Sequence, residues 1–272
     1  MTTRPPRVII TGAGIAGLTA ALILHAAGIT DVTVREAVAE LHPLGVGINQ
    51  LPHAVRELIE LGLGERLAAI GVATADPTFL THRGHRIWSE PRGLHAGYRW
   101  PQYSIHRGRL QLMLLEAVRE RLGPESVVLG SPVTGPGHEA DLLVGADGIR
   151  SSVRRALFPA DGEPLPGGDV LWRGTTYAKP FLTGGSMLMI GDSTQKLVIY
   201  PVLAARRGVR PADQPGHPAP GARRGRAHGR LEPARRGGAR PAPRARPALR
   251  RAGHPRAHRG RGAGVPVPAR RP

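Results

Sequence analysis

A glycine-rich turn between a strand pattern and a helix pattern constrains the fold more than any other feature of this sequence. Arg7 to Thr11 (RVIIT) is a short β-branched run, and GAGIAG follows at residues 12–17. Residues 18–27 are good helix formers that end before Gly28. The order strand, glycine turn, helix predicts the first unit of a dinucleotide-binding α/β fold.

The three glycines have separate expected roles. Gly12 permits a tight turn, Gly14 lets backbone approach a pyrophosphate, and Gly17 lets the helix pack closely on the strand. A second β-branched stretch, Val32 to Val34, leads to Glu36, whose carboxylate can accept hydrogen bonds from both ribose hydroxyls. The alternative is a structural glycine turn with a surface glutamate. The pattern does not separate NAD from FAD, because both contain ADP.

The composition changes after Tyr200. Residues 201–272 hold 19 Arg, 15 Ala, 13 Pro and 11 Gly, and they carry a net charge of +17 out of the total of +18. All ten aromatic residues precede Pro201, and the chain has no cysteine for disulfide or thiolate chemistry. A segment of this kind cannot offset its ordering entropy by burial. We therefore predict that residues 203–272 are a disordered tail rich in Arg, Pro, Ala and Gly.

Two origins of this tail stay open. One is a genuine basic tail for RNA, DNA or acidic surfaces, where phosphate contacts dominate affinity. The other is an out-of-frame reading of a GC-rich gene, because Arg, Ala, Pro and Gly have codons built from G and C. Our hypothesis is that the true frame is lost shortly after Val202, and we expect no nucleic-acid partner unless the tail is genuine.

The N-terminus also resembles a targeting signal. Met1 to Arg7 is basic and residues 8–24 are largely apolar, as in a secretory signal. The glycine loop inside that apolar run is a pattern that a signal does not need, and no later stretch is long enough to span a bilayer. We expect a cytoplasmic protein without a membrane partner. The histidines show no zinc-type spacing, so we expect no metal.

Three later segments carry further patterns. A helix is predicted over residues 53–70, and the segment YSIHRGRL opens another helix that runs to Leu122. Residues 141–145 form an apolar strand that ends on Asp147-Gly148 and turns into a basic helix start.

With these motifs in place, residues 7–202 resemble the class A flavoprotein monooxygenases, the para-hydroxybenzoate hydroxylase-like family that hydroxylates aromatic rings. The resemblance is most specific at GAGIAG with Glu36, at the His-Arg-x-x-Leu stretch and at GADGIRSSVR. LWRG at 171–174 and KLVIYP at 196–201 are similar to the branch that acts on phenazine carboxylates. The family implies an α/β fold with a Rossmann-like, three-layer FAD-binding domain of the GR2 type and a β-rich substrate domain.

The resemblance implies a cofactor-binding role for six residues: Gly12, Gly14, Gly17, Glu36, Arg107 and Asp147. The glycines would hold the FAD pyrophosphate, and Glu36 would hold the adenosine ribose. Arg107 would reach the flavin from the start of its helix, and Asp147 would serve FAD and the transient NAD(P)H site. The alternatives are a surface cation at a helix start for Arg107 and a plain turn aspartate for Asp147.

The family also implies a reaction. NAD(P)H reduces the flavin, O2 adds to it to form a flavin hydroperoxide, and an oxygen atom is transferred to a small aromatic or heteroaromatic substrate. The protein supplies position and a dry pocket, so no catalytic side chain is assigned.

The resemblance divides the chain into parts. Residues 1–72 and 103–160 would form the FAD-binding domain, and residues 73–102 and 161–202 a partial substrate-binding β-sheet domain. Within the substrate domain we expect a hairpin over 77–90, with its turn at Arg83-Gly84. We also expect strands there over 170–177 and 186–200. The candidate pocket aromatics are Trp88, Trp172 and Tyr200, each with core packing as the alternative.

Two departures from the family limit the expected activity. No Gly-Asp motif followed by His and Pro returns after the substrate sheet, and Gly191-Asp192 fits a hairpin turn instead. The passage over 127–141 is also too short for the family's β-meander. We therefore predict that this chain as written binds FAD weakly and does not hydroxylate. An NAD-dependent dehydrogenase, a non-catalytic dinucleotide-binding remnant and nucleic-acid binding through the tail are the alternatives.

Overall fold

A parallel four-stranded sheet forms the base of the N-terminal part of the fold. The computed structural model describes residues 4–135, 140–165 and 167–203. The sheet has the order β8-β2-β1-β9 and consists of β1 (Val8–Thr11), β2 (Val32–Arg35), β8 (Val127–Val128) and β9 (Leu142–Gly145). Every pairing in it is parallel.

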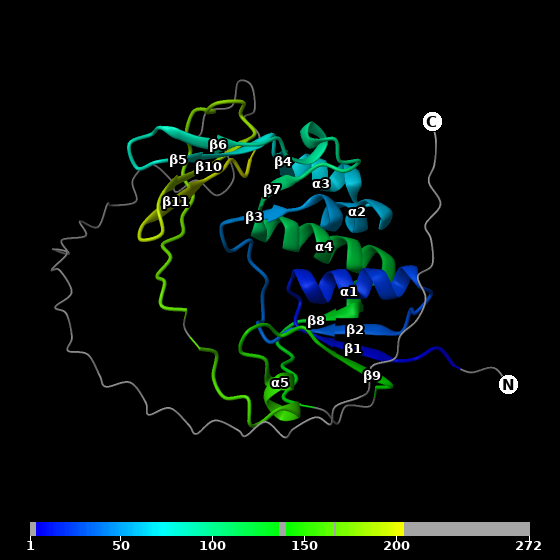
Figure 1. Ribbon diagram of the computed structural model, residues 1–272. Helices are drawn as coiled ribbons and strands as arrows, with labels where there is room; N and C mark the ends of the chain where they lie inside the picture. The colour runs from blue at the N-terminus through cyan, green and yellow to red at the C-terminus, as the bar shows by residue number, and fades with distance from the viewer. Residues whose placement is uncertain (1–3, 136–139, 166, 204–272) are drawn as a thin grey trace, which may run out of the picture. The chain divides into compact units, whose positions relative to one another are not determined.

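Two helices cover one face of this sheet. α1 (Ile15–Ala26) and α4 (Arg107–Leu122) lie side by side, with α1 next to the strands (Figure 1). Ile10 of β1, Leu18 of α1 and Leu114 of α4 are completely buried in the core that results. Burial of each such side chain contributes about 1.5–3 kcal/mol. The α/β class and the parallel sheet are thus as predicted.

The region expected to form one helix over residues 53–70 contains two. α2 (Pro52–Glu60) ends where Gly62 adopts a φ of +72°, and α3 (Gly64–Ile70) follows. The prediction of a single helix is wrong because the apolar spacing continues through Gly62, whereas the left-handed backbone there stops the helix.

A second sheet, which is antiparallel, connects α2 and α3 to α4. It has the order β3-β7-β4, with β3 (Gly47–Gln50), β7 (Tyr103–His106) and β4 (Gly71–Ala73). β7 leads directly into α4, so the helix predicted from the YSIHRGRL segment begins at Arg107 and is preceded by a strand.

A third sheet has the order β11-β10-β5-β6. Its strands are β5 (Asp76–Leu80), β6 (Arg86–Ser89), β10 (Ser186–Gly191) and β11 (Lys196–Ile199). β5 and β6 form the predicted hairpin, and β10 pairs with β5 in parallel, although about a hundred residues separate them in sequence. The expectation of one sheet assembled from two distant stretches is confirmed.

The turn between β10 and β11 also has the predicted form. Gly191 has a φ of +119°, and one carboxylate oxygen of Asp192 accepts hydrogen bonds from the backbone N of Thr194 at 2.8 Å and of Gln195 at 3.1 Å. The Thr194 hydroxyl donates to the same carboxylate oxygen at 2.6 Å. These bonds, the Thr194 side chain first, lower the pKa of Asp192 to about 2.

The expected strand over residues 170–177 is absent from the described residues. Leu171 is 73% exposed and Trp172 is 89% exposed, so this segment buries too little apolar surface to form a strand in the sheet. The remaining short elements are η1 (Gly93–Ala96), η2 (Pro124–Ser126) and α5 (Ser152–Leu157).

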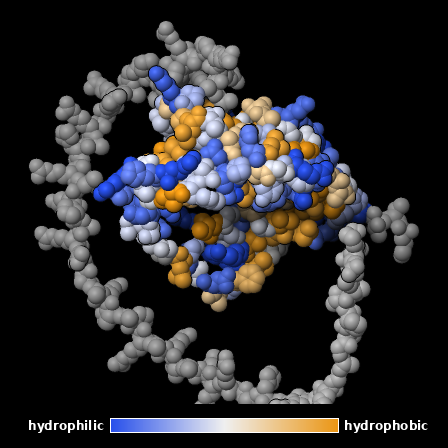
Figure 2. Space-filling model, turned by 45° about the horizontal axis from the view of Figure 1, so that its top comes forward, coloured by the Kyte–Doolittle hydropathy of each residue, from blue (hydrophilic) through white to orange (hydrophobic). Residues whose placement is uncertain are grey.

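The surface mixes polar and apolar residues. On the face shown in Figure 2, apolar patches interrupt the polar surface. Within the described ranges, no helix has the length and apolar character needed to cross a membrane. The predicted tail lies outside the described residues, apart from residue 203.

Candidate dinucleotide-binding site

The glycine loop after β1 lies against the connection between β9 and α5. Gly12 has a φ of +96°, and a Cβ atom built on it would lie 2.5 Å from the carbonyl oxygen of Ala146 and 3.1 Å from Cα of Asp147. Only glycine fits a left-handed position with backbone this close. The loop therefore brings the Asp147 segment, far away in sequence, beside the start of α1.

The other two glycines differ in their surroundings. A Cβ on Gly17 would collide with the carbonyl oxygen of Gly12 and lie 3.3 Å from Cγ2 of Ile10, so α1 packs directly on β1 and its loop. A Cβ on Gly14 would have no atom within 4 Å. Gly14 therefore leaves open space above the backbone at the start of the helix.

The start of α1 offers unpaired donors. Gly14 is the N-cap residue without a side-chain cap, and no acidic residue lies in the first turn. The first helical bond is donated by Leu18 N to Gly14 O at 3.0 Å. The N–H groups of residues 15–17 precede that bond, and with the positive end of the helix dipole they favour an anion.

Glu36 lies beside this loop. One of its carboxylate oxygens accepts a hydrogen bond from Ala13 N at 2.7 Å, and the other accepts one from Val38 N at 3.1 Å. Glu36 directly follows β2, which pairs with β1, so the parallel pairing places its carboxylate at the loop.

Asp147 has one engaged and one free carboxylate oxygen. Oδ2 accepts hydrogen bonds from Ser152 N at 2.7 Å and Ser152 Oγ at 2.9 Å, whereas the buried Oδ1 has no hydrogen-bond partner among the described residues. Burial raises the pKa of Asp147, but hydrogen bonds from Ser151 and Ser152 outweigh it and lower the pKa below its ordinary value. The Oδ2 contacts are those of a turn aspartate, and Oδ1 is buried without a hydrogen-bond partner among the described residues.

Arg107 is the first residue of α4 and is exposed. Its backbone N donates to Val46 O at 2.9 Å, and a Cβ on Gly45 would lie 3.6 Å from its Cβ and Cδ atoms. No hydrogen bond or ion pair within the described part of the chain engages its guanidinium. The side chain therefore runs along Gly45 with a free cationic end.

Two residues of α4 that the sequence reasoning did not single out connect the helix to the site. Gln111 Nε2 donates to the carbonyl oxygen of Ala13 at 2.8 Å, which fixes α4 against the glycine loop. A Cβ on Gly108 would lie 2.5 Å from Cα of Pro43, so the helix start touches the chain before β3. Their position one and four residues after Arg107 is the signal that could have identified them.

His106 adds no charge to this region at neutral pH. Its burial, followed by the nearby Arg109, lowers its pKa from the ordinary value. The cationic character at the start of α4 therefore belongs to the arginines.

The structure brings together five of the six candidate residues directly. The loop glycines, Glu36 and Asp147 meet around the start of α1, and Arg107 lies one helical turn from Gln111, which contacts the same loop. The open space at Gly14, the uncapped N–H groups and the unpartnered Asp147 Oδ1 fit a dinucleotide. In the described ranges, no group of three or more His, Asp or Glu residues could hold a metal ion.

The candidate pocket aromatics are dispersed. Trp88 is 48% exposed and its ring lies 5.4 Å from that of Phe79, whereas Trp172 points to solvent. Tyr200 lies against Gly47, where a Cβ would approach the tyrosine Cζ to 2.8 Å. Tyr200 thus contacts the β3 strand, Trp88 contacts Phe79, and Trp172 is 89% exposed.

The fold and this site are typical of dinucleotide-binding α/β proteins. Comparisons with known proteins identify the class that this chain resembles. No family model matches the sequence. The chain is 47% identical over 219 residues to phenazine 1,6-dicarboxylic acid hydroxylase PhzS of Lysobacter antibioticus, covering 72% of this chain and 54% of the relative. It is 34% identical over 240 residues to 3-amino-4-hydroxybenzoate 2-monooxygenase of Streptomyces cremeus, a match that covers 79% of this chain and 60% of the relative.

Solved structures show the same fold. A crystal structure of 2-methyl-3-hydroxypyridine-5-carboxylic acid oxygenase matches with a TM-score of 0.50 and 25% identity, over 57% of this chain and 42% of that one. Klebsiella pneumoniae HpxO, in a complex with FAD, matches in fold with a TM-score of 0.54 and 23% identity. The match covers 72% of this chain and 54% of that one.

The resemblance to class A flavoprotein monooxygenases is therefore confirmed over the matched part of the chain. The chain spans about half the length of the relatives it matches.

Proposed function

We propose that this chain carries the FAD-binding part of a monooxygenase that uses NAD(P)H and O2 to hydroxylate a small aromatic or heteroaromatic substrate. The observation that carries the proposal is the uncapped glycine loop with the Glu36 carboxylate against it. The sequence likeness to aromatic hydroxylases favours FAD over NAD as the resident dinucleotide.

Each site residue has a role in this proposal. Backbone at Gly14 and the N–H groups after it would bind the pyrophosphate, because no side chain of the described residues caps this helix start and the space at Gly14 is open. The Glu36 carboxylate would accept from the adenosine ribose, and Asp147 and the Arg107 guanidinium would contact the rest of the cofactor. When bound, FAD would supply the electron transfer and oxygen chemistry, and the protein would supply orientation.

The assignment of the sheets to two domains is part of the same proposal. We assign residues 1–72 and 103–160 to a three-layer Rossmann-like FAD-binding domain and residues 73–102 and 161–202 to a partial substrate domain. The third sheet falls wholly within the latter ranges. A cytoplasmic location is also proposed, because a chain without cysteine fits a reducing compartment.

We infer further that this chain as written holds FAD weakly and does not hydroxylate. The sequence lacks the family's returning Gly-Asp motif, and Gly191-Asp192 forms a hairpin turn instead. β9 is an edge strand of the parallel sheet, and its Leu142 is 47% exposed. Among the described residues, no strand pairs with the outer side of β9, so this apolar edge is left uncovered there.

The test is a pair of titrations of the purified full chain, one with FAD and one with NAD⁺, each followed by isothermal titration calorimetry. We expect FAD binding that saturates, but with an affinity too low for stoichiometric loading when the protein concentration is micromolar. Preference for NAD⁺ would favour a dehydrogenase, and failure to bind either would refute the dinucleotide proposal. Tight stoichiometric FAD with substrate-stimulated NAD(P)H oxidation coupled to hydroxylated product would refute the weak-binding inference alone.

A further inference from the structure

The side chain of Gln111 reaches the glycine loop from α4. Its Nε2 donates to the carbonyl oxygen of Ala13 at 2.8 Å, although 98 positions separate the two residues in sequence. Ala13 is completely buried and Gln111 is half-buried, so this hydrogen bond is partly shielded from water. The amide of Gln111 therefore acts on the backbone of the loop and not on a neighbouring side chain.

The backbone of Ala13 is held from a second direction. Its N–H donates to Oε2 of Glu36 at 2.7 Å, and Glu36 directly follows β2. Side chains from two other parts of the fold thus engage both polar backbone groups of this one residue. Because both bonds must be kept, the peptide units on either side of Ala13 have one preferred orientation.

The orientation of Ala13 also determines where the next N–H points. The bond between Ala13 and Gly14 is a planar trans peptide, so the Gly14 N–H points away from the side on which the Ala13 carbonyl accepts from Gln111. Among the described residues, no group accepts a hydrogen bond from the Gly14 N–H. A Cβ on Gly14 would have no atom within 4 Å. The Gln111 bond therefore sets the direction of a free donor at the open start of α1.

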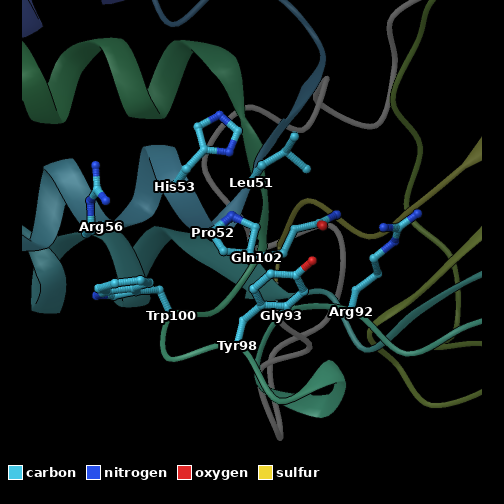
Figure 3. A pocket seen from close by; sticks show the side chains of 9 residues that line it. All are labelled: Leu51, Pro52, His53, Arg56, Arg92, Gly93, Tyr98, Trp100 and Gln102. Carbon is cyan, nitrogen blue, oxygen red and sulfur yellow. The ribbon is translucent and has the colours of Figure 1, made fainter. Parts of the chain in front are cut away.

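A cavity lined by arginines is a second place where a phosphate could be expected. It has a volume of about 310 Å³ and lies between the start of α2 and the segment that leads into β7 (Figure 3). Its two arginines already pair with carboxylates, Arg56 with Glu57 and Glu60, and Arg92 with Glu90. These ion pairs reduce the attraction of the cavity for an anion, so the uncapped glycine loop is the better pyrophosphate site.

From these contacts we propose that Gln111 is a positioning residue for the pyrophosphate of a bound dinucleotide. The inference rests on the proposed function of the glycine loop. Gln111 itself touches no ligand; through the Ala13 carbonyl it keeps the Gly14 N–H directed toward the phosphates. Without that bond the Ala13–Gly14 peptide can rotate, and a rotated peptide presents its carbonyl oxygen to an anion that needs a donor.

Gln111→Met removes the donor at nearly constant length and helix propensity. The full chain and the variant are titrated with ADP and with FAD by isothermal titration calorimetry, in high salt to screen the basic tail. We expect Q111M to bind both ligands about tenfold more weakly, and by the same factor, because both contain the pyrophosphate. Gln111→His should restore binding, since a neutral imidazole can donate from its Nε2. Gln195→Met, in the β10–β11 turn, is the matched control and should bind as the parent chain does.

The two ligands separate this inference from the proposed function. A loss confined to FAD would place the effect at the flavin end of the cofactor and overturn the pyrophosphate role, as would equal affinities for Q111M and the parent. A parent chain that binds ADP but not FAD would refute the flavin proposal, and the ADP titration would still decide the role of Gln111. A parent that binds neither ligand overturns both.

A spectroscopic measurement on the ligand-free chain tests the positioning directly. Labelling alanine with ¹³C at the carbonyl and glycine with ¹⁵N leaves only Ala–Gly peptides visible in a carbonyl-to-amide NMR correlation. In Q111M the Ala13–Gly14 signal should shift or broaden while the Ala27–Gly28 signal stays in place, and Q111H should keep the parent position. An unchanged Ala13–Gly14 signal overturns the proposal. A lower melting temperature with shifts at every Ala–Gly peptide would also overturn it, because Gln111 would then have a structural role only.

Discussion

Replacing Gly17 and Gly14 by alanine separates packing from ligand access at the glycine loop. A Cβ at Gly17 would collide with the carbonyl oxygen of Gly12, a backbone atom that cannot rotate away. Overpacking against rigid backbone costs about 3 kcal/mol at the upper end of its range. Because alanine favours the helix more than glycine does, the substitution also stabilises the fold by about 1 kcal/mol at this helical position. The net loss is about 2 kcal/mol, which corresponds to about 4–8 °C in melting temperature for a domain of this size.

Gly14→Ala is the counterpart. Its Cβ meets no atom within 4 Å and its φ is −73°, so the fold accepts it at a cost of about 0.5 kcal/mol at an N-cap. The methyl group would stand where the pyrophosphate approaches, and we expect FAD affinity to fall at least tenfold. Thermal melting by circular dichroism and FAD titration by fluorescence test both variants. A G17A chain that melts with the parent, or a G14A chain that binds FAD like the parent, would refute the reasoning.

Three further predictions concern charged groups of the site. Glu36→Gln should weaken FAD binding about tenfold with little change in melting temperature, because the amide oxygen can still accept from Ala13 N; unchanged affinity in the titration would contradict this. Arg107→Ala should weaken FAD binding, whereas the control Arg86→Ala, at another exposed arginine, should not. Equal losses would indicate a nonspecific charge effect. Since the pKa of Asp147 is lowered on folding, its stabilising contribution is present above its ordinary value of 3.8 and is lost as the pH falls below it. In a profile of melting temperature against pH, Asp147→Asn should therefore remove the loss of stability in this acidic range. Identical profiles for the variant and the parent chain would contradict the prediction.

Local sequence was enough for the elements whose signals lie within a few residues. The order of β1, glycine loop and α1, the β5–β6 hairpin and the Gly191 turn follow from β-branched runs and from glycines at left-handed positions. One such signal was misread, because the apolar spacing over residues 53–70 concealed the break at Gly62. The strand expected over residues 170–177 failed for a different reason: β-propensity is decided by packing, and the side chains of Val170, Leu171 and Trp172 are exposed.

The sequence by itself determined the type of fold and which residues to suspect, because the glycine spacing and the distance to Glu36 are properties of one continuous βαβ unit. Only the tertiary structure decided that Asp147 Oδ1 is buried without a hydrogen-bond partner among the described residues, and that Gln111 donates to Ala13 and so ties α4 to the glycine loop. Those facts depend on contacts between residues far apart in the chain. No local pattern encodes them, since each requires the sheets to be assembled before the groups can meet.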